Sequence, residues 1–450
     1  MIRASLKRPL LTRRAGALLG VALSASTIAT VAVAVPATAS SATPTASINV
    51  WWVTNPPFDT KVWPPIIKAF EAANPGDKVN LTIWPSNNTY KEKVALALGT
   101  SSPPALFFSW GGGPLATFIK AGVVQPFADP GENDAGTPSW SKDFLTSTLS
   151  AVTFNGKIYG MPILGTQPVF FFYNKAVFAK YHLSFPTTWA ELLSDIKTFN
   201  SNGVIPISLG NLDEWEGLMF LEYLGDRYGG PQAFLNIQDN MKGAWSQPAI
   251  QHALAGIQTL VKDDAFETGF NSITYTTGAT RALVEVGRAA MELMGSWDIS
   301  SFYSEQPSMF TNGTLGIGAF PTVPGGKGNI GDLEGNLTSY SALAAHLSPA
   351  QTYVAEKFQD YFATSAYAKT EDSYGQVGII TGTTSDLNVP PLGKYLVPVY
   401  NDVLHAPYFQ YSWDQSLGNP RETPMINNLW KIFQLTETPA QFAAAMNPYQ

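Results

Sequence analysis

Four tryptophans in this chain stand beside small or polar residues, at points where a predicted strand or helix begins or ends. Trp110 ends a predicted strand, Trp297 follows one, Trp215 opens a predicted helix, and Trp413 interrupts one. A flat indole can cover the apolar C–H face of a pyranose, while amide and carboxylate side chains bond its hydroxyl edges. Because ligands bind outside the carboxyl ends of strands in open α/β sheets, we interpret these residues as lining a sugar-binding cleft. The alternative for each is core packing.

Two pairs of carboxylates could instead carry out glycoside hydrolysis. Glu214 and Glu216 form one pair, and Glu292 and Asp298 form the other. Such enzymes hold their two carboxyl groups about 5–5.5 Å or roughly 6.5–9.5 Å apart, and the sequence does not give these distances. Glu214 and Glu216 stand at the start of a predicted helix, where the helix dipole alone favours acidic residues. A secreted glycoside hydrolase with a carboxylate pair in an aromatic cleft is therefore the alternative function.

Other catalytic and metal-binding signatures are weak or absent. The chain has no cysteine and four histidines, which excludes disulfides, thiolate metal sites and cysteine nucleophiles. The histidines lie far apart in the sequence and lack the HExxH spacing. Residues 326–331 match GxGxxG but open no helix, so a loop is the better interpretation. We expect no cofactor and no metal.

A phosphorylated or cationic ligand has little support. Phosphate would favour arginine in the strand-end loops, and Arg281, Arg288 and Arg421 all lie outside them. Composition also argues against nucleic acid, because the net charge is −7, the pI is about 5.2, and no basic block lies beyond the N-terminus. With 450 residues, 45% of them hydrophobic, the chain is long enough for two domains.

The first 39 residues have the pattern of a signal peptide. Residues 15–35 are apolar, 37–39 form an A-x-A cleavage site, and the preceding basic region consists of Arg3, Lys7, Arg8, Arg13 and Arg14. An uncleaved anchor is the alternative, because the apolar segment is long enough to span a membrane. Thr12-Arg13-Arg14 gives a weak indication of the twin-arginine route. We expect a disordered lead-in at 40–46 and a protein that is exported to the cell envelope or exterior without a lipidation cysteine.

Strands and helices then alternate along the chain. Apolar runs at 48–53, 78–84 and 105–110 predict strands, and helical spacing appears at 61–73, 89–98 and 115–121. This alternation is typical of a parallel α/β sheet. Further along, 187–200 predicts a helix with Thr187 or Thr188 as N-cap and Glu191 in its first turn. A second group of patterns predicts helices at 142–149, 214–228, 248–263, 277–286, 349–363 and 400–450, and strands at 205–209, 289–294, 315–321 and 341–346. We interpret 325–335 as a glycine-rich surface loop and 411–415 as a break in the last helical region.

The stretch 160–197 is the most specific part of the sequence. Its segment PVFFFYNKAVFAKYHLSFPTTWAEL resembles the YNK…PxTWxEL pattern of the extracellular solute-binding proteins of carbohydrate ABC importers (family 1, maltose-binding-like), and NGKIYG at 155–160 is similar to that family's NGKxYGxP. The resemblance implies a two-lobed periplasmic-binding-protein-like fold of type II. Each lobe would be a mostly parallel sheet flanked by helices, and the chain would cross between lobes near Gly165, 324–336 and 381–391. The first lobe would contain 47–164 and 336–383, and the second 165–335 and 384–450.

The resemblance also implies a function and a site. It implies a binding protein, not an enzyme, that captures a sugar or oligosaccharide in the interlobe cleft, acts as a monomer and delivers its ligand to the membrane subunits of an ABC importer. Asn55 stands where many relatives carry an acidic residue, and Gln167 where some carry a carboxylate. The expected ligand-binding residues are Asn55, Trp110, Gly111, Gly112, Gln167, Glu214, Trp215, Trp297, Asp298, Asn336, Trp413 and Asp414.

Overall fold

The computed structural model describes residues 44–449 except 87 and 133–135, and residues 44–449 belong to one compact unit. The predicted signal peptide, 1–39, and most of the predicted lead-in, 40–43, lie outside the described residues. Ala46, the last residue of that lead-in, is not free: its carbonyl accepts a hydrogen bond from the Lys78 amide at 3.0 Å. Within the described part, no helix is long and apolar enough to cross a membrane.

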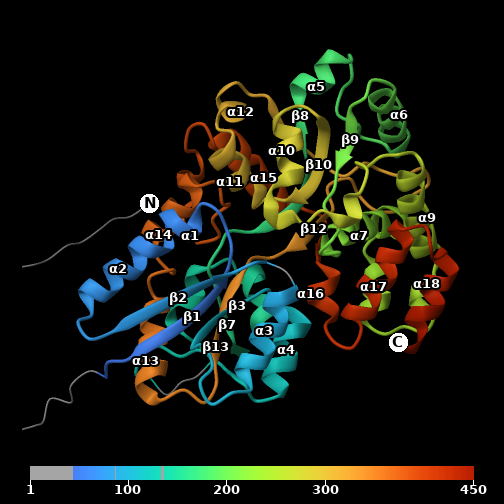
Figure 1. Cartoon of the computed structure of the whole chain (residues 1–450). Coiled ribbons are helices and arrows are strands. Elements are labelled where there is room, and N and C mark those ends of the chain that lie inside the picture. The colour runs from blue at the N-terminus through green and yellow to red at the C-terminus, as the bar shows by residue number, and fades with distance from the viewer. Residues whose placement is uncertain (1–43, 87, 133–135, 450) are drawn as a thin grey trace, which may run out of the picture. The chain divides into compact units, whose positions relative to one another are not determined.

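Two sheets, each with its own apolar core, form two lobes (Figure 1). The first sheet has the order β2-β1-β3-β13-β4, with β7 also pairing with β13. The second has the order β14-β12-β8-β10-β9, with β11 also pairing with β8. The first-sheet strands are β1 (Ser47–Val53), β2 (Lys78–Trp84), β3 (Leu106–Ser109), β4 (Val124–Gln125), β7 (Gly160–Pro162) and β13 (Tyr340–Ala344). The second-sheet strands are β8 (Gln167–Asn174), β9 (Ile205–Ser208), β10 (Ala289–Gly295), β11 (Leu315–Gly318), β12 (Leu333–Asn336) and β14 (Phe409–Tyr411).

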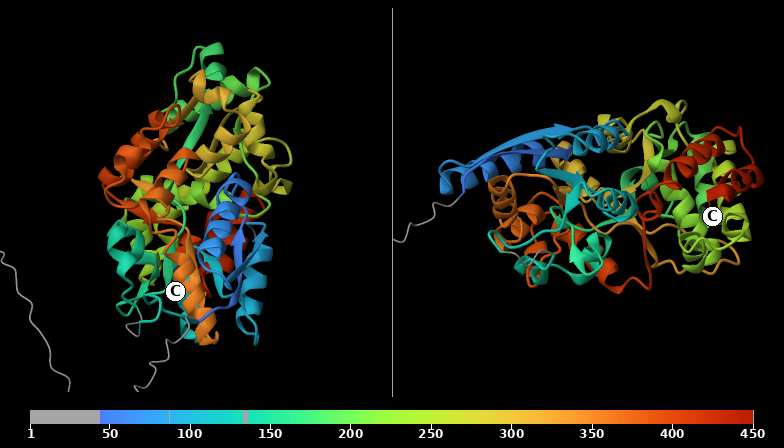
Figure 2. Two further views of the ribbon diagram at one scale, coloured as in Figure 1. Left: turned by 90° about the vertical axis from the view of Figure 1, so that its left-hand side faces the viewer. Right: turned by 90° about the horizontal axis from the view of Figure 1, so that it is seen from below.

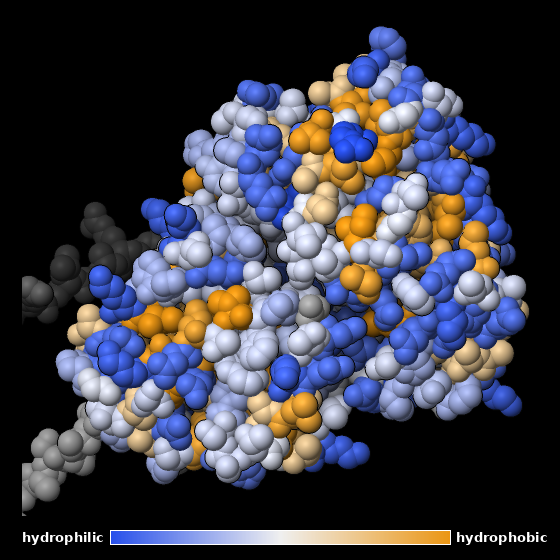
Figure 3. All heavy atoms as spheres, in the orientation of Figure 1, coloured by the Kyte–Doolittle hydropathy of each residue, from blue (hydrophilic) through white to orange (hydrophobic). Residues whose placement is uncertain are grey.

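Helices flank both sheets, as the further views also show (Figure 2). Around the first sheet lie α1 (Phe58–Lys61), α2 (Trp63–Ala73), α3 (Asn88–Leu98), α4 (Gly112–Lys120), α13 (Pro349–Gln359) and α14 (Ser365–Ser373). The second lobe contains α5 (Lys175–Lys180), α6 (Trp189–Ser201), α7 (Trp215–Gly229), α8 (Gln232–Gln238), α9 (Pro248–Lys262), α10 (Ala279–Glu285), α11 (Asp298–Glu305), α12 (Ser308–Thr311), α15 (Gly393–His405), α16 (Trp413–Leu417), α17 (Glu422–Phe433) and α18 (Pro439–Met446). The face seen in Figure 3 is mostly hydrophilic, with hydrophobic side chains in separate small patches.

Both sheets are mixed, so the prediction of mostly parallel sheets is wrong in strand direction. β1 pairs in parallel with β2 and β3, but β13 is antiparallel to β3, β4 and β7. In the second sheet β8 is antiparallel to β10, β11 and β12. A parallel neighbour needs a crossover, usually a helix, to bring the chain back to the same end. β8 and β13 enter their sheets directly from the other lobe, without such a crossover.

Local signals set several boundaries correctly, and one predicted helix is a different structure. The side chain of Thr188 accepts from the Glu191 amide and the Glu191 carboxylate accepts from the Thr188 amide, the capping box that begins α6. In place of the helix predicted at 142–149, two short 3₁₀ helices occupy Ser139–Asp143 and Thr146–Val152.

β12 and β14 are two strands that the sequence did not predict. β12 lies in the predicted surface loop, yet Glu334 is only 1% exposed. Gly335 stands there because of a close approach: a Cβ would lie 2.3 Å from the Gln167 carbonyl oxygen. β14 and α16 occupy the predicted helix break at 411–415.

The chain passes between the two cores at three places. β7 leads into β8, β12 leads into β13, and the third passage lies between Ile380 of the first core and Leu387 of the second. The first two passages run side by side, with Asn336 opposite Gln167 in register. The Thr166 amide donates to the Val377 carbonyl at 3.0 Å, which holds the chain before the third passage beside the first. The residue-level lobe boundaries given above remain a prediction.

Candidate functional site

A pocket lies between the lobes, where the crossing strands meet the loops after β1 and β3. It contains about 1180 Å³ of empty space, part of it open to solvent. First-lobe lining residues include Thr54, Asn55, Ser86, Asn88, Lys91, Phe108 and Trp110. Second-lobe and crossing residues include Gln167, Trp215, Met219, Tyr275, Thr276, Arg281, Trp297, Glu334, Asn336, Ser339, Ser412, Asp414 and Gln415.

Trp110 provides the aromatic surface of the first lobe. It directly follows β3, and its ring meets Phe108 at 5.0 Å and 73° and Tyr90 at 6.0 Å and 74° between ring centroids and planes. The Tyr411 hydroxyl of the second lobe donates to the Trp110 carbonyl oxygen. Edge-to-face contacts of this kind are favourable between aromatic rings. The indole is therefore packed against first-lobe rings, while the backbone of Trp110 is hydrogen-bonded to the second lobe.

Trp215, Trp297 and Tyr275 provide the aromatic surface of the second lobe. The ring centroids of Trp215 and Trp297 lie 6.1 Å apart, and those of Trp215 and Tyr275 lie 5.3 Å apart. The Tyr275 hydroxyl donates to Asp298 Oδ1 at 2.7 Å, and Arg281 Nη1 donates to the same oxygen at 3.0 Å. Asp298 thus positions Tyr275 from behind the pocket.

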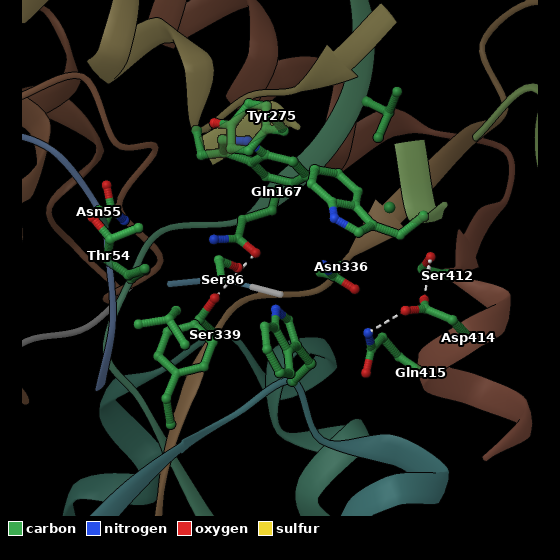
Figure 4. A pocket seen from close by; sticks show the side chains of 18 of the residues that line it. Thr54, Asn55, Ser86, Gln167, Tyr275, Asn336, Ser339, Ser412, Asp414 and Gln415 are labelled. Carbon is green, nitrogen blue, oxygen red and sulfur yellow. Dashed lines mark hydrogen bonds between the residues drawn. The ribbon is translucent and has the colours of Figure 1, made fainter. Parts of the chain in front are cut away.

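Amide side chains converge on the pocket from the crossing strands (Figure 4). The Ser339 hydroxyl donates to Gln167 Oε1 at 3.2 Å, which leaves the Gln167 amide nitrogen directed into the pocket. Asn336, the register partner of Gln167, also points into it. These two amides come from the strands that connect the lobes, so movement of one lobe against the other would displace them.

The loop after β1 is held by an acid. Asp59 accepts from the Thr54 hydroxyl at 2.7 Å and from the Asn55 amide at 2.9 Å. Burial raises the pKa of Asp59, and the two hydrogen bonds oppose that rise. Asp59 therefore stabilises the conformation of the loop, while the side chain of Asn55 lines the pocket.

The structure brings seven of the predicted ligand-binding residues to the pocket lining: Asn55, Trp110, Gln167, Trp215, Trp297, Asn336 and Asp414. Among the lining residues that the structure describes, Gly111, Gly112, Glu214, Asp298 and Trp413 do not appear. Asp298 lies behind Tyr275. Glu214 is the residue before α7, with a φ of 70°, and its burial and the neighbouring Asp213 raise its pKa.

The placement of Trp413 in the cleft is wrong. Its side chain is 0% exposed, stacks on Phe234 at 4.9 Å and 11°, and meets the edge of Trp245 at 6.1 Å. Polar neighbours on both sides, Ser412 and Asp414, line the pocket instead. Core packing, the alternative stated for each tryptophan, applies to this one.

Gly111 and Gly112 have structural positions. Gly112 has a φ of 60°, and a Cβ there would lie 2.1 Å from the Gln415 carbonyl oxygen of the second lobe. Gly111 has a φ of 84°, and a Cβ would lie 2.9 Å from the Ala151 carbonyl oxygen. Both backbone conformations favour glycine, and the side-chain-free surface lets the first lobe touch the second.

The pairs considered for hydrolysis lie away from the pocket surface. Glu216 and Glu292 are 0% and 1% exposed, and burial raises the pKa of each well above its ordinary value. Among described residues the carboxylates lining the pocket are Glu334 and Asp414. No group of three or more His, Cys, Asp or Glu in the described part could hold a metal ion.

Sequence reasoning missed several lining residues, including Lys91, Tyr275, Glu334, Ser339 and Gln415. Glu334 lies within the crossing predicted at 324–336, and Ser339 lies three residues beyond it, so a closer look at that crossing would have found both. Gln415 was within reach as the neighbour of Asp414. Lys91 and Tyr275 sit in a helix and a loop whose place at the pocket depends on tertiary packing, and no local signal marks them.

Comparisons with known proteins agree with this architecture. The pattern of bacterial extracellular solute-binding proteins matches residues 59–369. An uncharacterised ABC transporter extracellular-binding protein of Pyrococcus horikoshii is 25% identical over 311 residues, which are 68% of this chain and 65% of the relative. The multiple sugar-binding protein of Streptococcus mutans is 24% identical over 251 residues, 53% of this chain and 56% of the relative.

A solved structure from work on xylan utilization by the thermophilic bacterium Caldanaerobius polysaccharolyticus has a TM-score of 0.79 and 27% identity, and the match covers 90% of this chain and 100% of the other. The matches to the two curated relatives thus span between about half and two thirds of those relatives' own length. The match to residues 59–369 covers well over half of the sequence, and the chain belongs to the bacterial extracellular solute-binding protein family.

Proposed function

We propose that the protein binds a saccharide between its lobes and delivers it to the membrane subunits of an ABC importer. The observation that carries this proposal is the pairing of indoles from both lobes across one pocket, Trp110 from the first and Trp215 and Trp297 from the second. Aromatic faces with a few converging amides suit the apolar faces and polar edges of sugar rings. The name of the Streptococcus relative supports a sugar as the ligand, and the name of the Pyrococcus relative supports an ABC transporter as the partner.

The ligand leaves unchanged in this proposal. Of the two carboxylates at the pocket, Asp414 accepts from Ser412 at 3.0 Å and from Gln415 at 2.6 Å, and pairs with Lys91 at 3.5 Å. Both of its oxygens are therefore already engaged by the protein's own groups. Release to a transporter requires moderate affinity, in the micromolar range or about −8 kcal/mol.

Capture follows from hinge motion at the crossings. Gln167 and Asn336 lie on the crossing strands and Trp110 and Trp297 on opposite lobes, so closure would bring all four toward one ligand. We further propose that the protein is exported by its N-terminal segment, acts as a monomer, and needs no cofactor.

The test is binding without turnover. Xylo-, cello-, malto- and chito-oligosaccharides are titrated into the mature protein by calorimetry, and the same mixtures are analysed by chromatography after long incubation. Saturable binding with intact sugar supports the receptor. Release of shorter sugars would support the glycoside hydrolase alternative and overturn the proposal.

A further inference from the structure

The pocket has two opposite ends, and the lobes touch each other closely at one of them. Thr54 and Asn55 of the loop after β1 lie at one end, and Asp414 and Gln415 of α16 lie at the other (Figure 4). At the α16 end, contacts between described residues join the two lobes in three layers, from the depth of the pocket to its solvent edge. These layers determine how far a ligand can extend in that direction.

The deepest layer joins the backbone of Trp110 to the second lobe. The Tyr411 hydroxyl donates to the Trp110 carbonyl oxygen. Tyr411 is the last residue of β14 and directly precedes Ser412, which lines the pocket. The second lobe therefore covers the chain of the first lobe beside the indole that faces the ligand.

The middle layer is a contact between the backbones of α4 and α16. A Cβ on Gly113 would lie 2.6 Å from the Gly418 Cα, and a Cβ on Gly112 would overlap the Gln415 carbonyl group. Gly112 and Gly418 have φ values of 60° and 57°, in the left-handed region that favours glycine. Because even a methyl group has no room here, a sugar ring cannot pass between the two helices.

The outermost layer consists of charged side chains. Lys91 Nζ lies 2.8 Å from Glu422 Oε1 and 3.5 Å from Asp414 Oδ2. The Lys91 side chain is 31% exposed, against 13% for Glu422 and 6% for Asp414, so this bridge lies at the solvent edge of the pocket. Together these layers form an end wall, made by residues 91 and 110–113 of the first lobe and 411–422 of the second. The Lys91 bridge is the part of this wall that one substitution can open.

We propose that the end wall acts as a stop, so that the protein recognises a terminal sugar of an oligosaccharide and rejects a chain that continues past Asp414. This inference rests on the proposed saccharide-binding function and adds which part of the saccharide the pocket takes. With the lobes in contact, a bound chain can leave the pocket only away from α16, and one of its two termini faces Asp414 and Lys91. An internal stretch of a polysaccharide, which continues on both sides, does not fit.

The physical basis of this selection is steric exclusion. A clash with a longer ligand discriminates against it without adding affinity for the shorter one. The expected signature is therefore a ratio of two affinities, for an extended and an unextended form of the same sugar. A general weakening of binding leaves that ratio unchanged, so the ratio separates the stop from a merely structural role of the lobe contact.

The experiment first identifies a sugar that binds. Short xylo-, cello-, malto- and chito-oligosaccharides are screened against the mature wild-type protein by thermal shift, and the tightest binder is titrated by calorimetry. Two end-blocked forms of that sugar follow, one with a p-nitrophenyl group at the reducing end and one with a benzyl ether at O4 of the non-reducing ring. We expect at least one of them to bind at least about tenfold more weakly than the unblocked sugar, because its substituent meets the end wall.

Lys91→Ala opens the edge of the end wall, and Lys93→Ala, at an exposed position of α3, is the matched control. In Lys93→Ala the ratio of affinities should equal that of wild type. In Lys91→Ala the ratio should fall to about threefold or less, even though the unblocked sugar itself binds more weakly. The melting temperature without sugar shows whether each variant is folded.

The outcomes separate the two proposals. If no sugar binds the wild-type protein, the proposed function fails. If sugars bind, and both end-blocked forms bind as tightly as the unblocked sugar, the stop is overturned and the function stands. If Lys91→Ala weakens blocked and unblocked sugars by the same factor, Lys91 acts only as a contact between the lobes, and its assignment to the stop is wrong.

Discussion

Lys91 of the first lobe lies with its Nζ 2.8 Å from Glu422 Oε1 of the second. The same nitrogen is 3.5 Å from Asp414 Oδ2 and 5.7 Å from the centroid of the Trp110 ring. Burial lowers the pKa of Lys91, but the attraction of Asp414 and Glu422 outweighs burial, and the pKa is raised overall. The ammonium group of Lys91 thus joins the two lobes at the edge of the pocket, and it lies over the ring of Trp110.

Replacement of Lys91 by methionine is expected to weaken sugar binding by about three- to tenfold. The change leaves Asp414 and Glu422 without their cation where the lobes meet, and partly exposed pairs of this kind contribute up to about 1 kcal/mol each. Calorimetric titration with the best sugar measures the effect. Lys93→Met, at an exposed position on the same helix, is the matched control, and equal affinity of both variants would show that the interlobe pair does not support binding.

Replacement of Trp297 or Trp110 by alanine is expected to weaken sugar binding at least about tenfold, because stacking area on one side of the ligand is lost. Both rings line the pocket, so the fold should survive. Titration calorimetry and the unfolding temperature measure these two effects separately. Trp430→Ala is the control, as Trp430 is partly buried on α17 and is absent from the described pocket lining. Unchanged affinity in both pocket variants would remove the aromatic-cleft assignment.

The contrast between Trp297 and Trp413 shows what the sequence could and could not predict. Trp297 follows a strand whose apolar run is read locally, and the end of that strand fixes the side chain at the pocket. Trp413 has equally polar neighbours, but its environment is set by Phe234 and Trp245, which come from more than 160 positions earlier in the chain. Contacts between residues so far apart in the sequence cannot be inferred from the local spacing of apolar residues.

The segment around Glu334 was also mispredicted because a tertiary contact determines its structure. Glycines at 325–335 indicated a loop, whereas Gly335 is required because β12 approaches Gln167 closely. The resemblance of 168–192 to the binding-protein pattern led to the lobes and their crossings, but strand direction depended on how the chain enters each sheet. Fold class, the strand-end residue Trp110 and the crossing residues Gln167 and Asn336 were therefore predictable, and the buried strand that carries Glu334 was not.

Gly113 provides a test of lobe contact that is independent of the sugar. A Cβ on Gly113 would lie 2.6 Å from the Gly418 Cα, at the meeting of α4 with the end of α16. Gly113→Ala should hold the lobes apart at this point and reduce the population of the binding-competent form, so apparent affinity should fall by about fivefold or more. Small-angle scattering with and without sugar, together with calorimetry, measures both effects. Gly99→Ala, whose nearest contact would be 3.6 Å, is the control. Equal scattering profiles and equal affinities for the two variants would contradict the expected separation of the lobes.

Glu356 of α13 should make stability depend on pH. Burial raises its pKa from 4.5 to about 7, the hydrogen bond from the Ala128 amide at 3.1 Å opposes this, and the charges of Asp360 and Asp129 add to it. Because the folded pKa exceeds the unfolded one, the native state binds more protons between these values, and the contribution of Glu356 to the free energy of unfolding falls as pH rises from about 4.5 to about 7.

Glu356→Gln keeps an acceptor for Ala128 and removes the titration. The variant should therefore be more stable than wild type at about pH 8, by on the order of 2 kcal/mol, and should show a smaller difference between about pH 5 and pH 8. Urea unfolding at both pH values measures this, and Glu92→Gln at an exposed position is the control. Parallel pH profiles for wild type and Glu356→Gln would show that the carboxyl stays ionised in the fold, with the Ala128 amide outweighing burial.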